Sequence, residues 1–278
     1  MKLALCLLAK NEELYIQEFL DHYKNLGIDK IYIYDNNDSP DQLPPYVEKY
    51  GNFVEIIPYN NIKMSISVQK SIYTEWYNKY KDDYDWMMCI DADEFITLKS
   101  AKSLKDYLSQ DCFAPVDKIS LCWMNYCSEV GDFLYRPVKL VDRLTRLSYK
   151  SKEQKTIIRG GLEGVIYNDA HIQKPKLMMA NSSGEIIEDP QYYIVKDFHK
   201  GEAWINHYMA KTLEEWCKLR LFKPFGDGNR CTVSQYIHLC GPLSEKEKSW
   251  IKNWIRSGKS QKIGDWQPIK VEKPKEED

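Results

Sequence analysis

Three carboxylates within four residues, Asp91, Asp93 and Glu94, stand directly after the apolar segment 86–90. Like charges at the end of a buried strand repel one another unless a cation or water lies in front of them. Carboxylate oxygens suit Mg²⁺ or Mn²⁺, and these ions commonly bridge protein acids to phosphate oxygens. The pattern therefore predicts a DxD motif that holds a nucleoside diphosphate through a divalent cation. The alternative is a plain solvated strand end, and the polar segment 83–85 fits the same pattern in an expected loop.

The segments around this motif alternate between strand and helix patterns. Asn11 is a credible cap for a first helix that stops at Gly27. The predicted strands are 2–9, 28–34, 53–57 and 86–90, and a second predicted helix is 65–80. This alternation indicates an α/β fold with a mostly parallel, Rossmann-like sheet flanked by helices. Ligands of such sheets bind beyond the carboxyl ends of the strands, so Asn11, Asp35 and residues 91–94 should share one rim.

The second half of the chain has weaker signals. We expect a short helix at 103–110, a strand at 118–123, an irregular segment at 125–189 and a helix at 211–222. Ser244 and Glu247 form a capping box that opens a C-terminal helix. The predicted organisation is a catalytic domain at 1–225 and a helical extension with a charged tail at 226–278. Within the domain, the resemblance described below implies a nucleotide-sugar-binding half at 1–124 and an acceptor-side half at 125–225.

Composition excludes several classes of protein. A formal net charge of -2 argues against a basic nucleic-acid-binding surface. Eight scattered Cys without a CxxC pair indicate free thiols in a reducing compartment rather than disulfides or a zinc site. The apolar N-terminal run 3–9 is too short to cross a bilayer, and no other segment resembles a membrane span. We therefore expect a cytoplasmic protein.

Three motifs together resemble a known family. They are Leu-Leu-Ala-Lys-Asn-Glu at 7–12, Tyr-Asp-Asn-Asn at 34–37 and Ile-Asp-Ala-Asp-Glu-Phe at 90–95. Their order and spacing resemble GT-A glycosyltransferases of family 2 and, more closely, the family 92-like branch. The segments 155–159 (KTIIR) and 207–216 (HYMAKTLEEW) are similar to further segments of that branch. The resemblance implies a GT-A fold, a nucleotide-sugar donor, with a UDP-sugar preferred, and Mn²⁺ or Mg²⁺ as the metal.

Within that resemblance, individual residues acquire expected roles. Asp93 is the expected metal ligand, Asp91 would lie near the ribose or donor sugar, and Glu94 would support the ion. Asp35 would contact the base, although it could instead be an Asx-turn residue, as Asn11 could be only a helix cap. The expected donor-binding set is Ala9, Asn11, Glu12, Asp35, Asn36, Asp91, Lys155 and Lys211.

A histidine could complete the metal site, because imidazole tolerates Mn²⁺. His207 is the first candidate, since it lies in a matched segment, and His171 is the second. Lys155, Arg159 and Lys211 could neutralise the diphosphate. Inverting transfer, which the family 2-like fold favours, needs a carboxylate base. The candidates are Glu163, Asp169, Glu214 and Glu215, with Glu215 included among the expected catalytic residues.

The expected acceptor is a glycan or a lipid-linked oligosaccharide in surface polysaccharide synthesis. The helix at 244–256 has a narrow apolar stripe flanked by Lys and Arg, so it could contact the inner face of a membrane or dock on the protein. Two other functions compete with transfer. One is a non-catalytic glycan- or nucleotide-binding module, and the other is a metal-dependent phosphohydrolase that uses the same acidic strand end.

Overall fold

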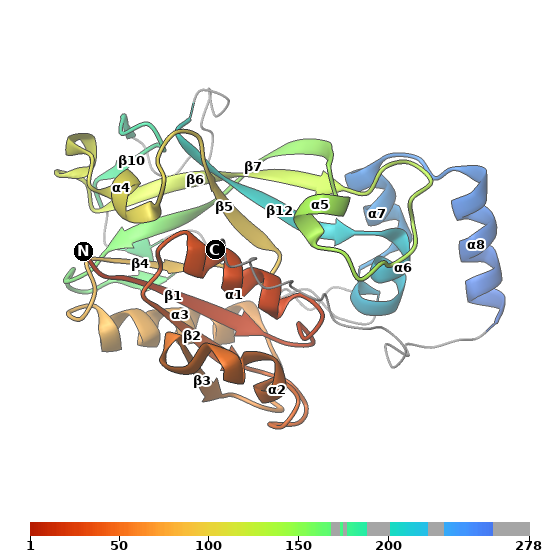
Figure 1. Cartoon of the computed structure of the whole chain (residues 1–278), viewed down its shortest axis with the longest axis horizontal. Coiled ribbons are helices and arrows are strands. Elements are labelled where there is room, and N and C mark those ends of the chain that lie inside the picture. The colour runs from red at the N-terminus through yellow and green to blue at the C-terminus, as the bar shows by residue number, and fades with distance from the viewer. Residues whose placement is uncertain (168–172, 175–176, 188–200, 222–230, 258–278) are drawn as a thin grey trace, which may run out of the picture.

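The computed structural model describes residues 1–167, 173–174, 177–187, 201–221 and 231–257 (Figure 1). His171 and Asp169, both named as candidates from the sequence, lie outside these residues. So do residues 226–230 and 258–278 of the expected C-terminal extension.

The N-terminal half is a parallel sheet in the order β3-β2-β1-β4. Its elements are β1 (Leu3–Ala9), α1 (Ile16–Asn25), β2 (Lys30–Asp35), α2 (Pro44–Val47), η1 (Glu48–Phe53), β3 (Val54–Pro58), α3 (Ile66–Tyr80) and β4 (Trp86–Cys89). Four strands and the helix α3 confirm the sequence prediction. Ser65 caps α3 by accepting a hydrogen bond from the Val68 N–H.

Alternate side chains of β1 face two different layers. Leu3, Leu5 and Leu7 pack in one apolar cluster with α1, whereas Ala4 and Cys6 pack in another with α3. Both faces of the strand are buried, as expected for a parallel sheet covered by helices on both sides. The predicted α/β class, a large and mostly parallel sheet flanked by helices, is therefore confirmed.

The first helix starts later than the sequence predicts. α1 begins at Ile16 with Tyr15 as its cap residue, and Asn11 lies outside the helix in a left-handed conformation with φ 57°. Asn11 is thus not a helix cap. The residues between them form a loop in which the Tyr15 and Ile16 N–H groups both donate to the Glu12 carbonyl.

The rest of the chain extends the same sheet beyond β4. These elements are β5 (Glu94–Leu98), α4 (Leu104–Leu108), η2 (Asp111–Phe113), β6 (Lys118–Cys127), α5 (Leu140–Arg143), β7 (Arg146–Arg159), β10 (Met179–Ala180), β11 (Ile186–Ile187) and β12 (Ala203–Lys211). β8 (Ile166–Tyr167) and β9 (Gln173–Lys174) form a separate two-stranded sheet. The full order is β11-β10-β6-β7-β4-β1-β2-β3, with β12 beside β5 and β6.

The expected irregular segment at 125–189 is wrong for its first part, because β7 is a 14-residue strand inserted between β4 and β6. β12 was also not foreseen. β7 is antiparallel to both β4 and β6, and β12 is parallel to β6, so β4, β6 and β12 all run in one direction. Their carboxyl ends therefore reach the same rim as those of β1 and β2. The division proposed at residues 124 and 125 falls inside β6.

The C-terminal elements form their own apolar cluster. They are α6 (Leu213–Glu215), the π-helical turn η4 (Trp216–Arg220), α7 (Val233–Cys240) and α8 (Glu245–Arg256). The predicted helix at 211–222 is thus replaced by a strand end, a short α-helix and a π-turn. The Ser244–Glu247 capping box of α8 is present.

The apolar stripe of α8 is docked rather than free. Trp250, Ile251 and Trp254 pack on the cluster that α6 and α7 form, and the rings of Trp250 and Phe133 lie 5.9 Å apart. Ile255, 63% exposed, is the exception. No helix within the described ranges has the length and apolar character needed to cross a bilayer.

Candidate active site

The acidic motif forms a tight turn between β4 and β5. The Glu94 N–H donates to the Asp91 carbonyl over 3.0 Å, and the Glu94 carboxylate accepts from the Asp91 N–H over 2.9 Å. These bonds fix the backbone, so that Asp91, Asp93 and Glu94 stay close together at the rim. The Asp91 side chain is partly exposed, whereas those of Asp93 and Glu94 are buried.

A buried ammonium group, Lys155 on β7, compensates two of the acids. Its Nζ lies 2.9 Å from Asp91 Oδ2 and 3.4 Å from Glu94 Oε2. Burial alone would raise the pKa of Asp91, but the Lys155 charge outweighs it and holds that pKa below its ordinary value. For Glu94 burial prevails, and its pKa is raised well above the ordinary value. The structure thus places Lys155 against Asp91 and Glu94, and its expected contact with a diphosphate stays a prediction.

Asp93 is held by two other cations. Its Oδ2 lies 2.5 Å from Arg220 Nη2 and 3.4 Å from Lys211 Nζ, while its Oδ1 faces His207 Nε2 at 3.6 Å. These positive neighbours outweigh burial and hold the pKa of Asp93 well below its ordinary value. We call Asp91, Asp93, Glu94, Lys155, Lys211 and Arg220 the strand-tip cluster. It contains three carboxylates and three cations.

Several buried polar atoms beside this cluster have no hydrogen-bond partner among the described residues. They are Glu94 Oε1, His207 Nδ1 and both side-chain amide atoms of Asn125. In the sheet, His207 on β12 lies opposite Glu94 on β5 and opposite Asn125 on β6. The three residues therefore stand side by side on neighbouring strands at the rim. Buried polar groups are normally paired, and each exception calls for an explanation such as a missing water, ion or ligand.

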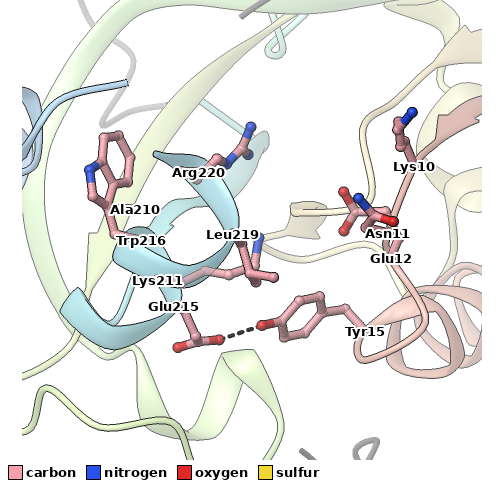
Figure 2. A pocket seen from close by; sticks show the side chains of 10 residues that line it. All are labelled: Lys10, Asn11, Glu12, Tyr15, Ala210, Lys211, Glu215, Trp216, Leu219 and Arg220. Carbon is pink, nitrogen blue, oxygen red and sulfur yellow. Dashed lines mark hydrogen bonds between the residues drawn. The ribbon is translucent and has the colours of Figure 1, made fainter. Parts of the chain in front are cut away.

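A small cavity, open to solvent, adjoins the cluster (Figure 2). One wall is the β1–α1 loop with Lys10, Asn11, Glu12 and Tyr15, and the other is the end of β12 with α6 and η4, including Lys211 and Arg220. Of the three non-glycine residues with positive φ in the described ranges, two line this cavity, Asn11 at 57° and Lys211 at 53°. Such strained conformations concentrate at functional sites.

The residues expected to bind the nucleoside, Asp35 and Asn36, lie at the end of β2, next to the β1–α1 loop. Asp35 is 1% exposed and accepts the Asn37 N–H over 3.0 Å, which is the Asx-turn arrangement. The buried Asn36 donates from its backbone N–H to the Ala9 carbonyl and from its side chain to two loop carbonyls. Asn37 Oδ1 accepts the Asn11 N–H over 2.7 Å. These bonds join the ends of β1 and β2, which shapes the loop that carries Asn11 and Glu12.

Glu215 belongs to a different, closed arrangement. Its carboxylate makes two bonds with Arg143, of 2.6 and 2.7 Å, and accepts hydrogen bonds from the Tyr15 hydroxyl, the Thr212 hydroxyl and the Thr212 N–H. We call Glu215, Arg143, Tyr15 and Thr212 the Glu215 cluster. Burial alone would raise the pKa of Glu215, but Arg143 and the hydrogen bonds hold it below the ordinary value. Because every carboxylate lone pair already has a donor, Glu215 does not suit the expected role of general base.

The other expected residues do not gather at the cavity. Arg159 stacks on Trp86 at the opposite end of β4, with its guanidinium 4.3 Å from the ring centre, so it does not face the acids. Glu163 pairs with Lys81. Glu214 pairs with Lys218 over 2.7 Å and accepts the Tyr135 N–H.

The family model for glycosyltransferase family 92 matches residues 2–224. This range contains the acidic turn, both cavity walls and the whole strand-tip cluster. The chain belongs to glycosyltransferase family 92. The family 92 resemblance seen in the sequence motifs is therefore confirmed.

Among solved structures, this family 92 chain is similar to Staphylococcus aureus TarS 1-349. The two share 17% identity over 57% of this chain and 47% of that chain, with a TM-score of 0.36. It is also similar to 4-diphosphocytidyl-2C-methyl-D-erythritol synthase from Anaerococcus prevotii (10% identity, 68% and 92% coverage, TM-score 0.34). A third is mannosyl-3-phosphoglycerate synthase from Rubrobacter xylanophilus (16% identity, 49% and 44% coverage, TM-score 0.30). The chain thus spans about half of the TarS fragment that it matches. A search among curated proteins found no significant match.

The possible metal ligands of this family 92 chain fit an ion whose coordination is completed by substrate. No three His, Cys, Asp or Glu side chains in the described ranges are placed to hold an ion by themselves. Asp93 and His207, however, face one another with a carboxylate oxygen and an imidazole nitrogen, two ligand types suited to Mn²⁺. Mg²⁺ and similar ions are often bound by one or two protein groups together with substrate phosphates.

Three residues of the site were missed by the sequence analysis: Arg220, Tyr15 and Asn125. Arg220 contacts Asp93, which lies 127 positions earlier in the sequence. The Lys211 ammonium lies 4.7 Å from the centre of the Tyr15 ring. Asn125 carried a weak signal, because it lies two residues after the predicted strand 118–123 and is the kind of polar residue that marks a functional rim.

Proposed function

We propose that this chain transfers a sugar from a nucleoside-diphosphate donor to an acceptor hydroxyl, with a divalent metal and inversion at the sugar carbon. The observation that carries the proposal is the acidic turn, with its unpaired buried atoms, beside a cavity lined by cations. Family 92 membership supports the reaction class. A uridine diphosphate sugar is the proposed donor, and a glycan or lipid-linked oligosaccharide the proposed acceptor.

The donor diphosphate would lie in the cavity between the two walls. Lys211 on one wall and Lys10 on the other offer ammonium groups there, and Asn11 and Glu12 supply polar atoms beside Lys10. Asp35, Asn36 and Ala9 would shape the nucleoside end through the hydrogen bonds that join β1 to β2. Asp91, partly exposed and oriented by Lys155, would face the ribose or the donor sugar.

The leaving diphosphate gains negative charge during transfer, so stabilising it lowers the barrier. Asp93 and His207 would hold Mn²⁺ or Mg²⁺, which would supply positive charge to the leaving group. Lys211 adds a fixed cation, and Tyr15 below it restricts where the ammonium can lie. An inverting reaction also needs a base. None of Glu163, Glu214 and Glu215 presents a free carboxylate to the cavity, and Asp169 lies outside the described ranges.

Thermal shift with uridine and guanosine diphosphates, each with and without Mn²⁺ or Mg²⁺, tests the proposal. A ligand present at a hundredfold excess over its Kd should stabilise the protein by about 2.7 kcal/mol. Donor turnover, measured next on the nucleotides that bind, separates a transferase from a binding module. The proposal fails if no nucleoside diphosphate binds with either metal, and a phosphohydrolase is indicated if phosphate is released.

A further inference from the structure

Arg220 occupies an unusual position in the strand-tip cluster. It ends the π-helical turn η4, a conformation that occurs mostly in short pieces at functional sites. Its guanidinium contacts Asp93 at 2.5 Å and also lines the open cavity, with 20% of the side chain exposed. Lys211, the second cation on Asp93, is more deeply buried and rests on Tyr15. Arg220 is therefore the cation with room to change partners.

The metal ion and the donor diphosphate would each bind one member of the Arg220–Asp93 ion pair. Asp93 is the proposed metal ligand, but its Oδ2 already accepts a hydrogen bond from Arg220. A guanidinium binds phosphate oxygens in a planar, two-bond geometry that an ammonium cannot match. A diphosphate in the cavity would thus offer Arg220 a second acceptor, and accepting it would release Asp93.

We infer that Arg220 moves from Asp93 to the donor diphosphate, so that donor binding and metal binding depend on one another. The inference rests on the proposed function. Without a nucleotide, the Arg220–Asp93 ion pair opposes metal binding, because the ion must displace a cation. With the diphosphate in place, Asp93 is freed and the metal binds more tightly. Coupling of this kind is reciprocal, so the metal must strengthen diphosphate binding by the same factor.

The variant Arg220→Met makes this inference testable, because two effects should have opposite signs. Removing the guanidinium frees Asp93, so Mn²⁺ alone should bind more tightly than it does to the wild type. The same change removes a phosphate contact, so uridine diphosphate in EDTA should bind more weakly. We expect each shift to be roughly tenfold, within the usual range for coupled sites. A purely structural role would not produce opposite changes.

The experiment measures Mn²⁺ binding by the loss of its free-ion EPR signal and nucleotide binding by calorimetry, on the full chain. Arg220→Lys keeps a charge without the planar fork and should lie between Met and wild type. Lys218→Met is the matched control: Lys218 lies on the same turn but pairs with Glu214, so neither affinity should change. Circular dichroism confirms folding, and the Lys variant carries the test if Arg220→Met does not fold.

The outcomes separate the two proposals. If the wild type binds no nucleoside diphosphate with either metal, the proposed function fails. If the wild type binds nucleotide with Mn²⁺ but the Arg220 variants keep both wild-type affinities, only the exchange of Arg220 is refuted. A variant that weakens both affinities together also refutes it, since that result indicates general damage to the site.

Discussion

The strand-tip cluster and the Glu215 cluster both consist of carboxylates and cations, but they differ in how fully their hydrogen bonds are satisfied. Each places carboxylates against cations with most of these side chains buried, and in each the formal charges balance, three against three in the first and one against one in the second. Tyr15 touches both, through its hydroxyl to Glu215 and its ring to Lys211. Charge balance therefore does not distinguish the proposed functional cluster from the structural one in this protein.

Hydrogen-bond satisfaction does distinguish them. Glu215 has a donor for every lone pair and links four segments: the start of α1, α5, the end of β12 and α6. At the strand tip, Glu94 Oε1 and His207 Nδ1 are buried without partners in the described ranges. A saturated buried network makes a structure rigid, whereas an unsaturated one has free energy to gain from a ligand.

The largest expected effect is on stability, at Glu215. Glu215→Gln leaves Arg143 buried without a compensating charge, and breaking a buried pair in this way costs about 3–5 kcal/mol. Chemical denaturation measures the loss. Glu245→Gln is the control, since this exposed α8 residue pairs with the exposed Lys248 and should change stability by about 0.5 kcal/mol or less. Equal effects of the two changes would show that saturation of Glu215 does not stabilise the fold.

At Asp93 the main effect should be on function. Asp93→Asn should lower sugar transfer by roughly 10²–10³-fold, the usual cost of losing one charge-stabilising group. Its stability cost should be only about 1–2 kcal/mol, because Arg220 can turn into the cavity when its partner is lost. Transfer assays beside denaturation curves test both parts. Near-normal, metal-dependent transfer by this variant would overturn the role of the acidic turn.

His207→Ala should weaken metal binding by about 10–100-fold while nucleoside diphosphate still binds. The physical reason is that His207 Nε2, which faces Asp93 Oδ1, is one of the two protein groups proposed to hold the ion. Titration of activity with Mn²⁺ measures the change. An unaltered titration curve would show that His207 does not bind the metal.

How much of this the sequence predicts depends on the range of the interactions. The rim was predictable, because local strand and helix patterns define βαβ units and all parallel strands end on one side. β7 was not, since its residues Lys-Ser-Lys-Glu-Gln-Lys-Thr have the polar composition of a loop. Only pairing with β4 and β6 makes it a strand, and these partners are distant in sequence.

The distinction between the two clusters was also beyond the sequence. Glu215 stands beside Glu214 in a matched segment, and its sequence neighbours do not reveal that Arg143, 72 positions earlier, saturates it. Arg220 likewise appears as one more cation near a helix end until the π-turn aims it at Asp93. Residue types indicated which chemistry was present, but lone-pair satisfaction depends on contacts between distant segments.

The smallest expected effect, a dependence of stability on pH, separates the clusters by sign. The pKa of Glu215 is held below its ordinary value, so its contribution is fully present above about pH 4.3 and is lost as the pH falls through the folded-state value. The pKa of Glu94 is raised by burial, so its contribution is present at low pH and is lost as the pH rises through the folded-state value. Urea denaturation across the pH range should show that Glu215→Gln flattens the acid side of the stability curve. Glu94→Gln should instead remove a decline toward higher pH. If both variants change the same side, Glu94 is compensated in the folded protein as fully as Glu215, and the contrast between an open and a closed cluster does not hold.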